Sequence, residues 1–360
     1  MTGTDQSEAL RERVADAADQ GEALSITGSG SKHFYGNPVQ GSALDISAHR
    51  GIISYEPTEL VLTARAGTPI VEIEEALTAE GQRLAFEPPQ FNGGGTLGGV
   101  VAAGLAGPRR PYGGAVRDMV LGLRLINGRG ELMRFGGEVM KNVAGYDVAR
   151  LNTGALGTLG VITEVSLKVL PAPAARVTLE VEADPTQCHD LSEQWLRNGR
   201  PLSGMIHDGE RLYARFEGTT SAVDDAVAAI DGKALEPAAA DAFWQSIRDQ
   251  RHEFFAGDEQ PLWRISLPPA SDPTVYGERL LIDWSGQQLW LRGHPEPHNL
   301  RARAAAQGGS ATLFRGRIDG VGAFPPLDAV QARLHQNIKK AFDPHGILNP
   351  GRLYPDAEVS

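Results

Sequence analysis

Residues 93–118 read Gly-Gly-Gly-Thr-Leu-Gly-Gly-Val-Val-Ala-Ala-Gly-Leu-Ala-Gly-Pro-Arg-Arg-Pro-Tyr-Gly-Gly-Ala-Val-Arg-Asp, and this stretch decides the fold. A glycine inside a helix or strand costs about 0.5–1 kcal/mol relative to alanine, so this density is expected where the backbone must approach something closely. Leu97, Val100, Val101 and Leu105 have the spacing of a short buried helix. Either an extended, phosphate-bearing cofactor lies on the loop and the helix N-terminus, or the helix packs tightly on a sheet without a ligand.

The composition is that of an ordinary globular protein, and 360 residues suffice for two domains. The net charge of −11 argues against a nucleic-acid partner, which would need a basic face. The single cysteine, Cys188, excludes an internal disulfide, a four-cysteine zinc site and an iron–sulfur cluster. The N-terminus lacks the pattern of a secretory signal, and no apolar run is long enough to span a membrane. We therefore expect a cytoplasmic protein.

A second glycine-rich turn lies near the N-terminus. A helix is predicted over residues 7–20, followed by a strand at 23–27 that runs into Gly28-Ser-Gly-Ser-Lys32. A strand ending in Gly-x-Gly-Ser-Lys suggests a phosphate-cradling turn. The spacing is not that of a Walker loop, and no convincing helix follows as in a Rossmann fingerprint. Taken alone, the turn fits a phosphate site and a plain turn equally well.

The next segments predict strands, a helix and a hairpin. Strands are expected at 52–55 and 60–66, joined by a turn at Pro57. Thr68 is expected to cap a helix that has Pro69 at its first position and ends at Gly81. Strands at 120–126 and 131–135 form a hairpin through residues 127–130. After glycine-punctuated residues 151–160, apolar and polar residues alternate over 161–169, which predicts a half-buried strand.

Pro171 and Pro173 mark a predicted domain boundary. Beyond it, strand-like runs (176–181, 211–216, 262–267, 288–291) alternate with helical ones (186–196, 222–230, 239–254, 299–307). This pattern predicts a separate α+β domain that covers what the first half binds. Leu327, Val330, Leu334, Ile338 and Phe342 give a final helix with an apolar face. The Pro- and Gly-rich tail 343–352 is expected to dock through its apolar residues 347 and 348.

Six motifs in this order resemble one family. They lie at residues 28–31, 94–99, 107–118, 141–147, 157–164 and 343–351. Together they resemble the FAD-binding proteins of the p-cresol methylhydroxylase / vanillyl alcohol oxidase type. The runs 107–111 and 135–142 are most similar to the small FAD-binding subunits of bacterial glycolate oxidases. The resemblance covers about residues 5–354.

The resemblance implies an α+β fold with a two-lobed FAD-binding domain (residues 1–172, with lobes of about 1–50 and 51–172), a cap domain (173–315) and a C-terminal segment (316–360) that returns to the FAD domain. It implies that the backbone of residues 28–31 holds the FAD pyrophosphate and that Ile162 meets the adenine through its backbone. The residues expected at FAD are Gly28, Ser29, Gly30, Ser31, Lys32, Pro88, Gly95, Thr96, Gly98, Gly99, Gly104, Arg117, Gly157, Ile162 and Asn349.

Two departures from the family pattern matter. Some relatives attach FAD covalently to a histidine where this chain has Ser31, so we expect non-covalent FAD, with nearby His33 as the less favoured attachment point. The metal-binding histidine run of the larger 2-hydroxy-acid dehydrogenases is missing. His294 and His298 are four residues apart, but the prolines at 295 and 297 prevent a helix there, so we expect a surface loop and no metal.

Flavin oxidation of a 2-hydroxy acid needs a cation for the carboxylate, a base for the hydroxyl proton and a well-aligned hydride. Arg109 and Lys141 are the candidate substrate anchors, and Arg110 and Arg117 lie in the same motifs. Each could instead form a salt bridge or contact an FAD phosphate. No base is evident, which leaves open that a sibling flavin subunit oxidises the substrate. Tyr146 and its neighbour at 147 are expected to be structural.

The expected function is that of an FAD-binding subunit in a complex that oxidises glycolate, a small 2-hydroxy acid, to glyoxylate. The expected partners are a sibling FAD-binding subunit and an iron–sulfur subunit that receives the electrons, with any inner-membrane association passing through partners. Two alternatives stay open: a structural subunit with an FAD fold but no turnover, and a stand-alone FAD oxidase of another alcohol. The residues do not distinguish glycolate from D-lactate.

Overall fold

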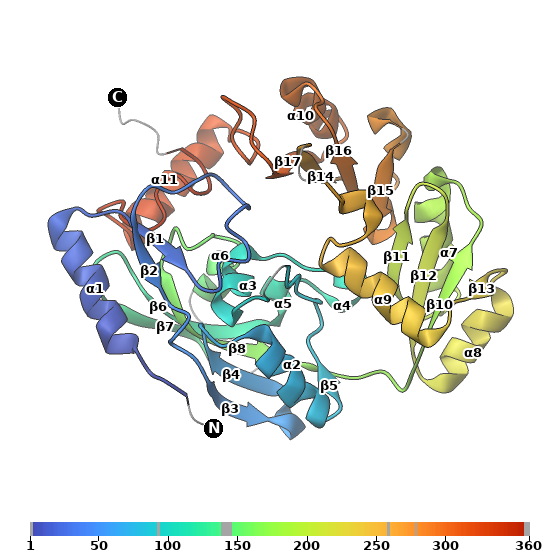
Figure 1. The fold of residues 1–360 in the computed structure, drawn as a ribbon, viewed down its shortest axis with the longest axis horizontal. Coiled ribbons are helices and arrows are strands. Elements are labelled where there is room, and N and C mark those ends of the chain that lie inside the picture. The colour runs from blue at the N-terminus through green and yellow to red at the C-terminus, as the bar shows by residue number, and fades with distance from the viewer. Residues whose placement is uncertain (1–2, 92–93, 138–145, 258–259, 278, 356–360) are drawn as a thin grey trace. The chain divides into compact units, whose positions relative to one another are not determined.

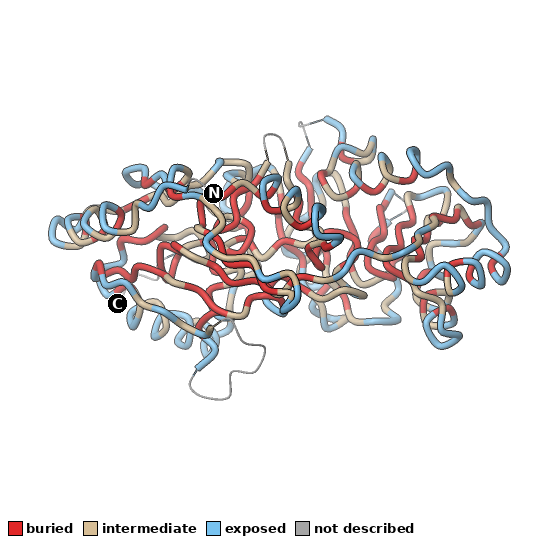
Figure 2. Tube along the Cα trace, turned by 90° about the horizontal axis from the view of Figure 1, so that it is seen from below, coloured by how far each residue is buried: buried red, intermediate tan, exposed pale blue. Residues whose placement is uncertain are grey.

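The fold is that of a computed structural model, which describes residues 3–91, 94–137, 146–257, 260–277 and 279–355 (Figure 1). The chain divides into two compact units. The first contains residues 1–105, 115–171 and 326–360, and the second contains 106–114 and 172–325. Buried residues follow the strands of each unit, while exposed residues lie on the helices and the connecting loops (Figure 2).

The first unit combines short sheets with helices. Its helices are α1 (Ser7–Gln20), α2 (Ile70–Ala79), α3 (Leu97–Ala103), α5 (Val116–Met119), α6 (Val148–Asn152) and α11 (Ala329–Phe342). Its strands are β1 (Leu24–Thr27), β2 (Ser42–Asp45), β3 (Ile52–Glu56), β4 (Val61–Arg65), β5 (Gln82–Arg83), β6 (Val120–Ile126), β7 (Leu132–Gly136), β8 (Val161–Lys168) and β9 (Leu170–Pro171). The helix predicted over residues 7–20 and the short buried helix at 97–103 are confirmed.

Two sheets form the frame of this unit. Strands β1 and β2 pair in parallel, and a five-stranded antiparallel sheet has the order β3-β4-β8-β6-β7. The predicted β6–β7 hairpin is confirmed, and the side-chain oxygen of Asn127 accepts hydrogen bonds from the amides of Arg129 (2.9 Å) and Glu131 (3.0 Å). The α+β fold class is confirmed.

Two local predictions in this unit are wrong. Strand β8 is not half-buried, because it is the central strand and both faces are covered: Ile162 and Ser166 are buried like their neighbours. The buried Ser166 hydroxyl pairs with the Thr63 hydroxyl at 2.8 Å. Thr68 does not cap α2. Its hydroxyl instead accepts a hydrogen bond from the Gly51 amide at 2.8 Å, and no side chain caps that helix.

The C-terminal tail is docked, as predicted, and the element that it pairs with is β1. The amide of Leu24 donates to the carbonyl of Ile347 (2.7 Å), and the amide of Asn349 donates to the carbonyl of Leu24 (3.0 Å). Ile347 and Leu348 are both buried. A segment far along the chain therefore completes the edge of the small sheet beside the first glycine turn.

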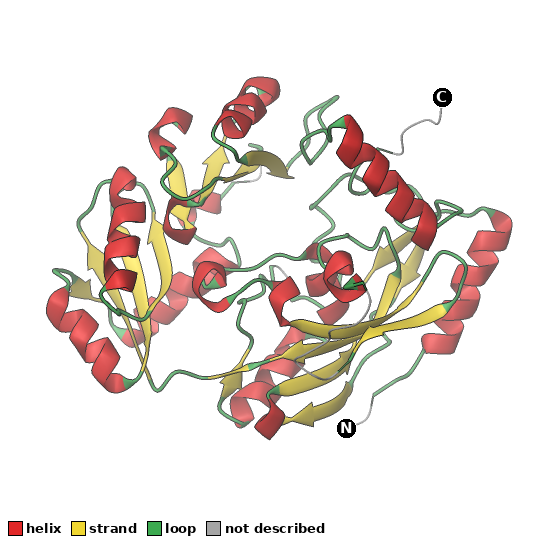
Figure 3. Cartoon of the chain, turned by 180° about the vertical axis from the view of Figure 1, so that it is seen from behind, coloured by secondary structure: helices red, strands yellow, loops and turns green. Residues whose placement is uncertain are grey.

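The second unit is built on one large sheet with helices packed on it (Figure 3). The strand order is β13-β10-β12-β11-β15-β16-β14-β17. The strands are β10 (Ala175–Val181), β11 (Leu202–His207), β12 (Leu212–Gly218), β13 (Lys233–Ala234), β14 (Leu262–Ser266), β15 (Leu280–Asp283), β16 (Gln288–Arg292) and β17 (Ser310–Arg315). The helices are α4 (Arg110–Gly113), α7 (Cys188–Arg197), α8 (Thr220–Ala229), α9 (Pro237–Arg248) and α10 (Pro297–Ala306).

The limits of the units differ from the predicted domain limits at two places. Residues 106–114 were expected in the FAD domain and 316–325 in the C-terminal segment, yet both belong to the second unit. Side chains of the first segment bond to residues of β12 and of the turn after β15. The second segment is tied to β17, because the Leu313 amide donates to the Ala323 carbonyl at 2.8 Å.

Candidate functional site

A cavity in the first unit is surrounded by the turn after β1, one face of α3 and the loop before β8. Its lining residues are Ser25, Ile26, Thr27, Gly28, Ser29, Gly30, Ser31, Lys32, His33, Val39, Ile46, Thr96, Gly98, Gly99, Ala102, Ala103, Leu156, Gly157, Gly160, Ile162, Asn349 and Arg352. The structure thus brings together most of the residues that were expected at FAD.

The turn Gly28–Ser31 presents backbone amides without protein acceptors. Gly30 has φ +74°, and a β-carbon on Gly28 would lie 2.3 Å from Thr96 Oγ1, so both positions require glycine. Within the described part of the chain, the four amides of this turn donate to no protein acceptor. Unpaired amides clustered in a turn make an anion-binding concavity. The geometry therefore fits a phosphate group.

Side chains of the turn connect it to the rest of the cavity wall. The Ser29 hydroxyl donates to the Gly94 carbonyl at 3.0 Å, which joins the turn to the long glycine stretch. The Lys32 ammonium donates to Ser31 Oγ at 3.3 Å and lies 5.6 Å from the centre of the Phe91 ring. A cation therefore stands beside the unpaired amides, which favours a bound anion.

At the N-terminus of α3, unlike in the Gly28–Ser31 turn, the backbone amides already donate to protein acceptors. The amides of Leu97 and Gly98 donate to the carbonyls of Thr68 (2.9 Å) and Ala66 (2.7 Å), and the Gly99 amide donates to the capping Thr96 hydroxyl. The expectation that this helix end binds the anion is therefore wrong, since its first amides already have protein acceptors. Glycine is required here for packing, because a β-carbon on Gly98 would lie 2.7 Å from that of Ala66.

Asn349 holds two walls of the cavity together. Its side-chain oxygen accepts from the Ile26 amide at 2.7 Å, and its amide nitrogen donates to the Leu156 carbonyl at 2.7 Å. Gly157, next in the chain, has φ +72°, and a β-carbon there would lie 2.8 Å from the Asn349 amide nitrogen. Asn349 thus positions β1 against the second glycine loop.

Arg352 and His33 also line the cavity; Arg352 was not predicted at the cofactor, and His33 was expected only as the less favoured point of covalent attachment. The Arg352 guanidinium donates to the carbonyl of Asn37 at 3.1 Å and to those of Lys32 and His33 at 3.2 Å each. It therefore fixes the far end of the turn, and its place directly after the Asn-Pro-Gly motif was the available signal. His33 Nε2 lies 2.9 Å from Thr27 Oγ1, so the imidazole is engaged with the strand before the turn.

Four residues expected at FAD do not line this cavity: Pro88, Gly95, Gly104 and Arg117. Gly104 ends α3 at φ +63° and packs on the backbone of Gly154. Arg117 is two-thirds exposed on α5 and lies 4.0 Å from the neighbouring carboxylate of residue 118. Lys141, one of the two candidate substrate anchors, lies outside the described residues.

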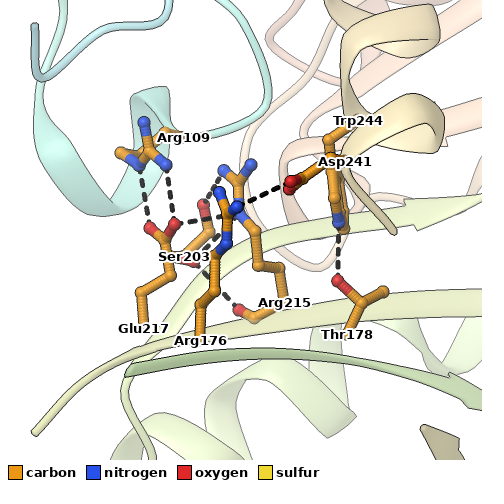
Figure 4. A network of polar contacts seen from close by, with 8 residues as sticks. All are labelled: Arg109, Arg176, Thr178, Ser203, Arg215, Glu217, Asp241 and Trp244. Atoms are coloured by element: carbon orange, nitrogen blue, oxygen red, sulfur yellow. Dashed lines mark hydrogen bonds and ion pairs between the residues drawn. The ribbon is translucent and has the colours of Figure 1, made fainter. Parts of the chain in front are cut away.

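Arg109 lies in the second unit and pairs with Glu217 (Figure 4). Its guanidinium makes two hydrogen bonds to the Glu217 carboxylate, at 3.0 and 2.9 Å, and both side chains are nearly buried. Arg215 lies 3.9 Å from the same carboxylate, bonds to both the hydroxyl and carbonyl of Ser203, and stacks on Trp244 at 4.6 Å. This arrangement favours a structural role for Arg109.

A strained turn holds the rest of the Arg109 segment. Trp284 and Ser285 adopt φ of +54° and +57°, which costs of order 1–3 kcal/mol per residue. The Trp284 indole donates to the Gly107 carbonyl at 3.1 Å, and the Arg110 guanidinium lies over its ring at 4.5 Å. The Tyr112 hydroxyl lies 2.6 Å from Ser285 Oγ, and burial raises the pKa of Tyr112.

The histidine, cysteine and carboxylate side chains of the described residues do not form a second candidate site. Among the described residues, no three His, Cys, Asp or Glu side chains are grouped to hold a metal. His298 lies in the first turn of α10, so that helix begins nearer the two prolines than expected, and both His294 and His298 are exposed. Burial raises the pKa of the Cys188 thiol to about 12.

No described helix has the length and apolarity to cross a membrane.

Comparisons with known proteins agree with this geometry. Residues 4–136 match the family described as "FAD binding domain", and residues 327–353 match "FAD linked oxidases, C-terminal domain". The first match contains the turn, α3 and four strands of the five-stranded sheet (β3, β4, β6 and β7), but not the central strand β8. The second contains α11 and the tail that carries Asn349 and Arg352.

One curated relative and one solved structure match nearly the whole chain, and a second relative matches less than half of it. Glycolate oxidase subunit GlcE of Escherichia coli (strain K12) is 46% identical, and the match covers 98% of both chains. Glycolate oxidase subunit GlcD of Bacillus subtilis (strain 168) is 33% identical over 42% of this chain and 33% of its own. The 4-ethylphenol oxidase from Gulosibacter chungangensis shares the fold, with a TM-score of 0.71 at 14% identity over 98% of this chain and 89% of its own. The chain therefore belongs to the family of FAD-linked oxidases that includes glycolate oxidase subunit GlcE.

Proposed function

We propose that this chain is the FAD-binding subunit of a complex that oxidises glycolate to glyoxylate. The observation that supports the proposal is the set of four unpaired amides in the Gly28–Ser31 turn, within the segment that matches an FAD binding domain. The substrate follows from the named activity of the relative that matches over 98% of the chain. When bound, FAD supplies two-electron redox chemistry.

The chain's own residues would hold FAD without a covalent bond. The amides of residues 28–31 would donate to the diphosphate, and Lys32 would add a positive charge at that end. The backbone at Ile162 would meet the adenine, as the resemblance implies. A serine at position 31 cannot form the histidyl link of some relatives, and His33 already contacts Thr27. Dissociation of the flavin on acid denaturation is the expected result.

The pairing of Arg109 is the basis for the roles that we propose for the subunits of the complex. Its bidentate pairing with Glu217 leaves it poorly suited to bind a substrate carboxylate. We therefore infer that the sibling FAD-binding subunit carries the substrate anchor and base, and that electrons leave through an iron–sulfur subunit. The first unit would serve as the FAD domain and the second as the cap. The complex would act in the cytoplasm, with any contact to the inner membrane made by its partners.

The test compares two glycines with the same backbone strain. Gly30 and Gly199 have φ of +74° and +72°, but only Gly30 lies in the cavity. In the co-expressed complex, Gly30→Val is expected to lower bound FAD in this subunit about tenfold or more, whereas Gly199→Val keeps FAD. Flavin is counted after acid release from the separated subunit, and glycolate oxidation is measured in parallel.

Two results of this test, and one separate measurement on the isolated chain, would contradict the proposal. Equal FAD in both variants would place the cofactor elsewhere. Full glycolate oxidation by a complex whose Gly30→Val subunit has lost its FAD would favour a structural subunit without turnover. Glycolate-independent oxygen consumption with another alcohol by the isolated chain would favour a stand-alone oxidase.

A further inference from the structure

The C-terminal tail holds the Gly28–Ser31 turn at both of its ends. Before the turn, the side-chain oxygen of Asn349 accepts a hydrogen bond from an amide of β1 at 2.7 Å. After the turn, one guanidinium nitrogen of Arg352 donates to the carbonyls of Lys32 and His33, each at 3.2 Å. Two residues of the same short tail therefore fix the two ends of the segment whose amides lack protein acceptors.

Arg352 also ties the loop that follows the turn to the tail. A second guanidinium nitrogen donates to the Asn37 carbonyl at 3.1 Å, and the Asn37 amide donates to the Arg352 carbonyl at 2.9 Å. The Asn37 side chain donates to the carbonyls of Gly351 and Leu353 at 3.0 and 3.2 Å. Because the donors of a guanidinium are fixed in one plane, bonds to three carbonyls restrict the loop strongly. We call these joined segments, residues 32–37 and 349–353, the tail clasp.

The tail clasp supplies order that the turn itself lacks. The four amides of residues 28–31 donate to no protein acceptor in the described chain, so they do not fix their own backbone. The two glycines of the turn have more backbone freedom than other residues would have. Donors that are held in place before a ligand arrives bind it more tightly, because less conformational entropy is lost on binding. Contacts from outside the turn therefore preorganise the anion site.

We propose that Arg352 is a positioning residue for FAD, which holds the end of the turn so that the amides of residues 28–31 converge on the diphosphate. The inference rests on the proposed function, because it takes FAD as the anion. Arg352 acts in it through the backbone that it holds, and not as a cation that binds phosphate. FAD binding and docking of the tail are then mutually dependent, because the factor by which the clasp strengthens FAD binding is also the factor by which FAD strengthens the clasp.

The first test compares two arginines that each donate to three carbonyls. Arg301 of the second unit is the matched control outside the cavity, and its acceptors are the carbonyls of Ala311, Gly322 and Ala323. In the full-length chain, Arg352→Gln is expected to weaken FAD binding about tenfold or more, whereas Arg301→Gln keeps the wild-type affinity. Flavin fluorescence measures the affinity, and the melting temperature of the FAD-free chain shows how far each variant destabilises the fold.

Arg352→Lys separates hydrogen bonding from charge. Lysine keeps the positive charge, but its donors share one nitrogen and cannot reproduce the planar fork that reaches all three carbonyls. The FAD affinity of this variant is therefore expected to lie between those of Arg352→Gln and the wild type. Wild-type affinity in Arg352→Lys, together with a loss in Arg352→Gln that shrinks at high salt, would assign the effect to charge and overturn the positioning role.

Hydrogen–deuterium exchange at the Asn37 amide tests the coupling between the cofactor and the tail. This amide donates to the Arg352 carbonyl, and Asn37 does not line the cavity. FAD should slow its exchange in the wild type and do so much less in Arg352→Gln. The Asn127 amide, which donates to the Glu131 carbonyl in the β6–β7 hairpin, is the control for general stabilisation. Equal exchange at Asn37 with and without FAD in the wild type would overturn the coupling.

The outcomes separate this inference from the proposed function. A wild-type chain that binds no FAD would contradict the proposed function, and this inference with it. A wild-type chain that binds FAD with the same affinity as Arg352→Gln would overturn only the role of Arg352. Equal losses of FAD affinity in Arg352→Gln and Arg301→Gln would also overturn that role, because any destabilising change would then release the cofactor.

Discussion

The Gly28–Ser31 turn and the Arg109 cluster both present several hydrogen-bond donors, and both come from motifs assigned to binding. The amides of the turn meet no protein acceptor among the described residues, whereas Arg109 donates twice to Glu217. An amide without a protein acceptor pairs with water or with a ligand, and several such amides that converge in one turn form a concavity suited to an anion. The unpaired set therefore indicates a binding site, and the paired set indicates a structural connection.

Removing Arg109 should give the largest effect and test the paired side of this comparison. Arg109→Ala leaves the buried Glu217 carboxylate without its bidentate partner, which is expected to cost about 3–5 kcal/mol. Denaturant unfolding measures the loss. Arg109→Ala combined with Glu217→Ala should recover part of it. If Arg109→Ala instead keeps wild-type stability and raises KM for glycolate, the residue is a substrate anchor and the structural interpretation is wrong.

Replacing Asn349 should have an intermediate effect on the stability of the first unit. Asn349→Ala leaves the Ile26 amide and the Leu156 carbonyl unpaired, and a buried unsatisfied group costs about 1–3 kcal/mol. FAD affinity should fall together with stability, because both walls of the cavity lose their link. Asn349→Asp keeps the acceptor for Ile26 and should lie between the wild type and the alanine variant. An alanine variant with lower FAD affinity but unchanged unfolding would instead indicate direct contact with the cofactor.

Replacing His49 should have the smallest effect on stability, and this effect should depend on pH. Its ring is buried, Nδ1 accepts from the Gln6 amide at 3.0 Å, and Nε2 donates to the Thr163 carbonyl at 3.0 Å. Burial lowers the pKa of His49 below its ordinary value. The unfolded chain therefore binds a proton at higher pH than the folded one, so stability should decrease as pH falls below about 6.5. Denaturant melts between pH 5 and pH 8 should show this slope, and His49→Gln should flatten it. An unchanged slope would assign the effect to other groups.

The sequence indicates the cofactor turn well because its requirements are local. A strand that ends in Gly-x-Gly-Ser-Lys determines the backbone of the turn, and Gly30 and Gly28 are required by φ and by close approach. The tail motif around Asn349 was found for the same reason, since its Pro, Gly and Asn residues determine their own turn. Its contacts with β1 and the second glycine loop are visible only in three dimensions.

The roles that depended on distant partners could not be predicted. Arg109 and Glu217 are 108 residues apart, so the sequence showed a cation but not its acceptor. Strands β11 and β15 were missed because they are buried along their length and lack the alternation that identifies a strand. Helical periodicity showed which residues of α11 share a face, but it could not show that Val330 and Leu334 on that face are exposed.

The most direct test of the central claim is hydrogen–deuterium exchange of the purified chain with and without FAD, resolved at residues 28–31 and 97–99. The amides of the turn should exchange fast without FAD and slowly with it, because the cofactor supplies their missing acceptor. The amides of Leu97, Gly98 and Gly99 already have protein acceptors and should change little. Protection confined to residues 97–99, with no change at 28–31, would contradict the account.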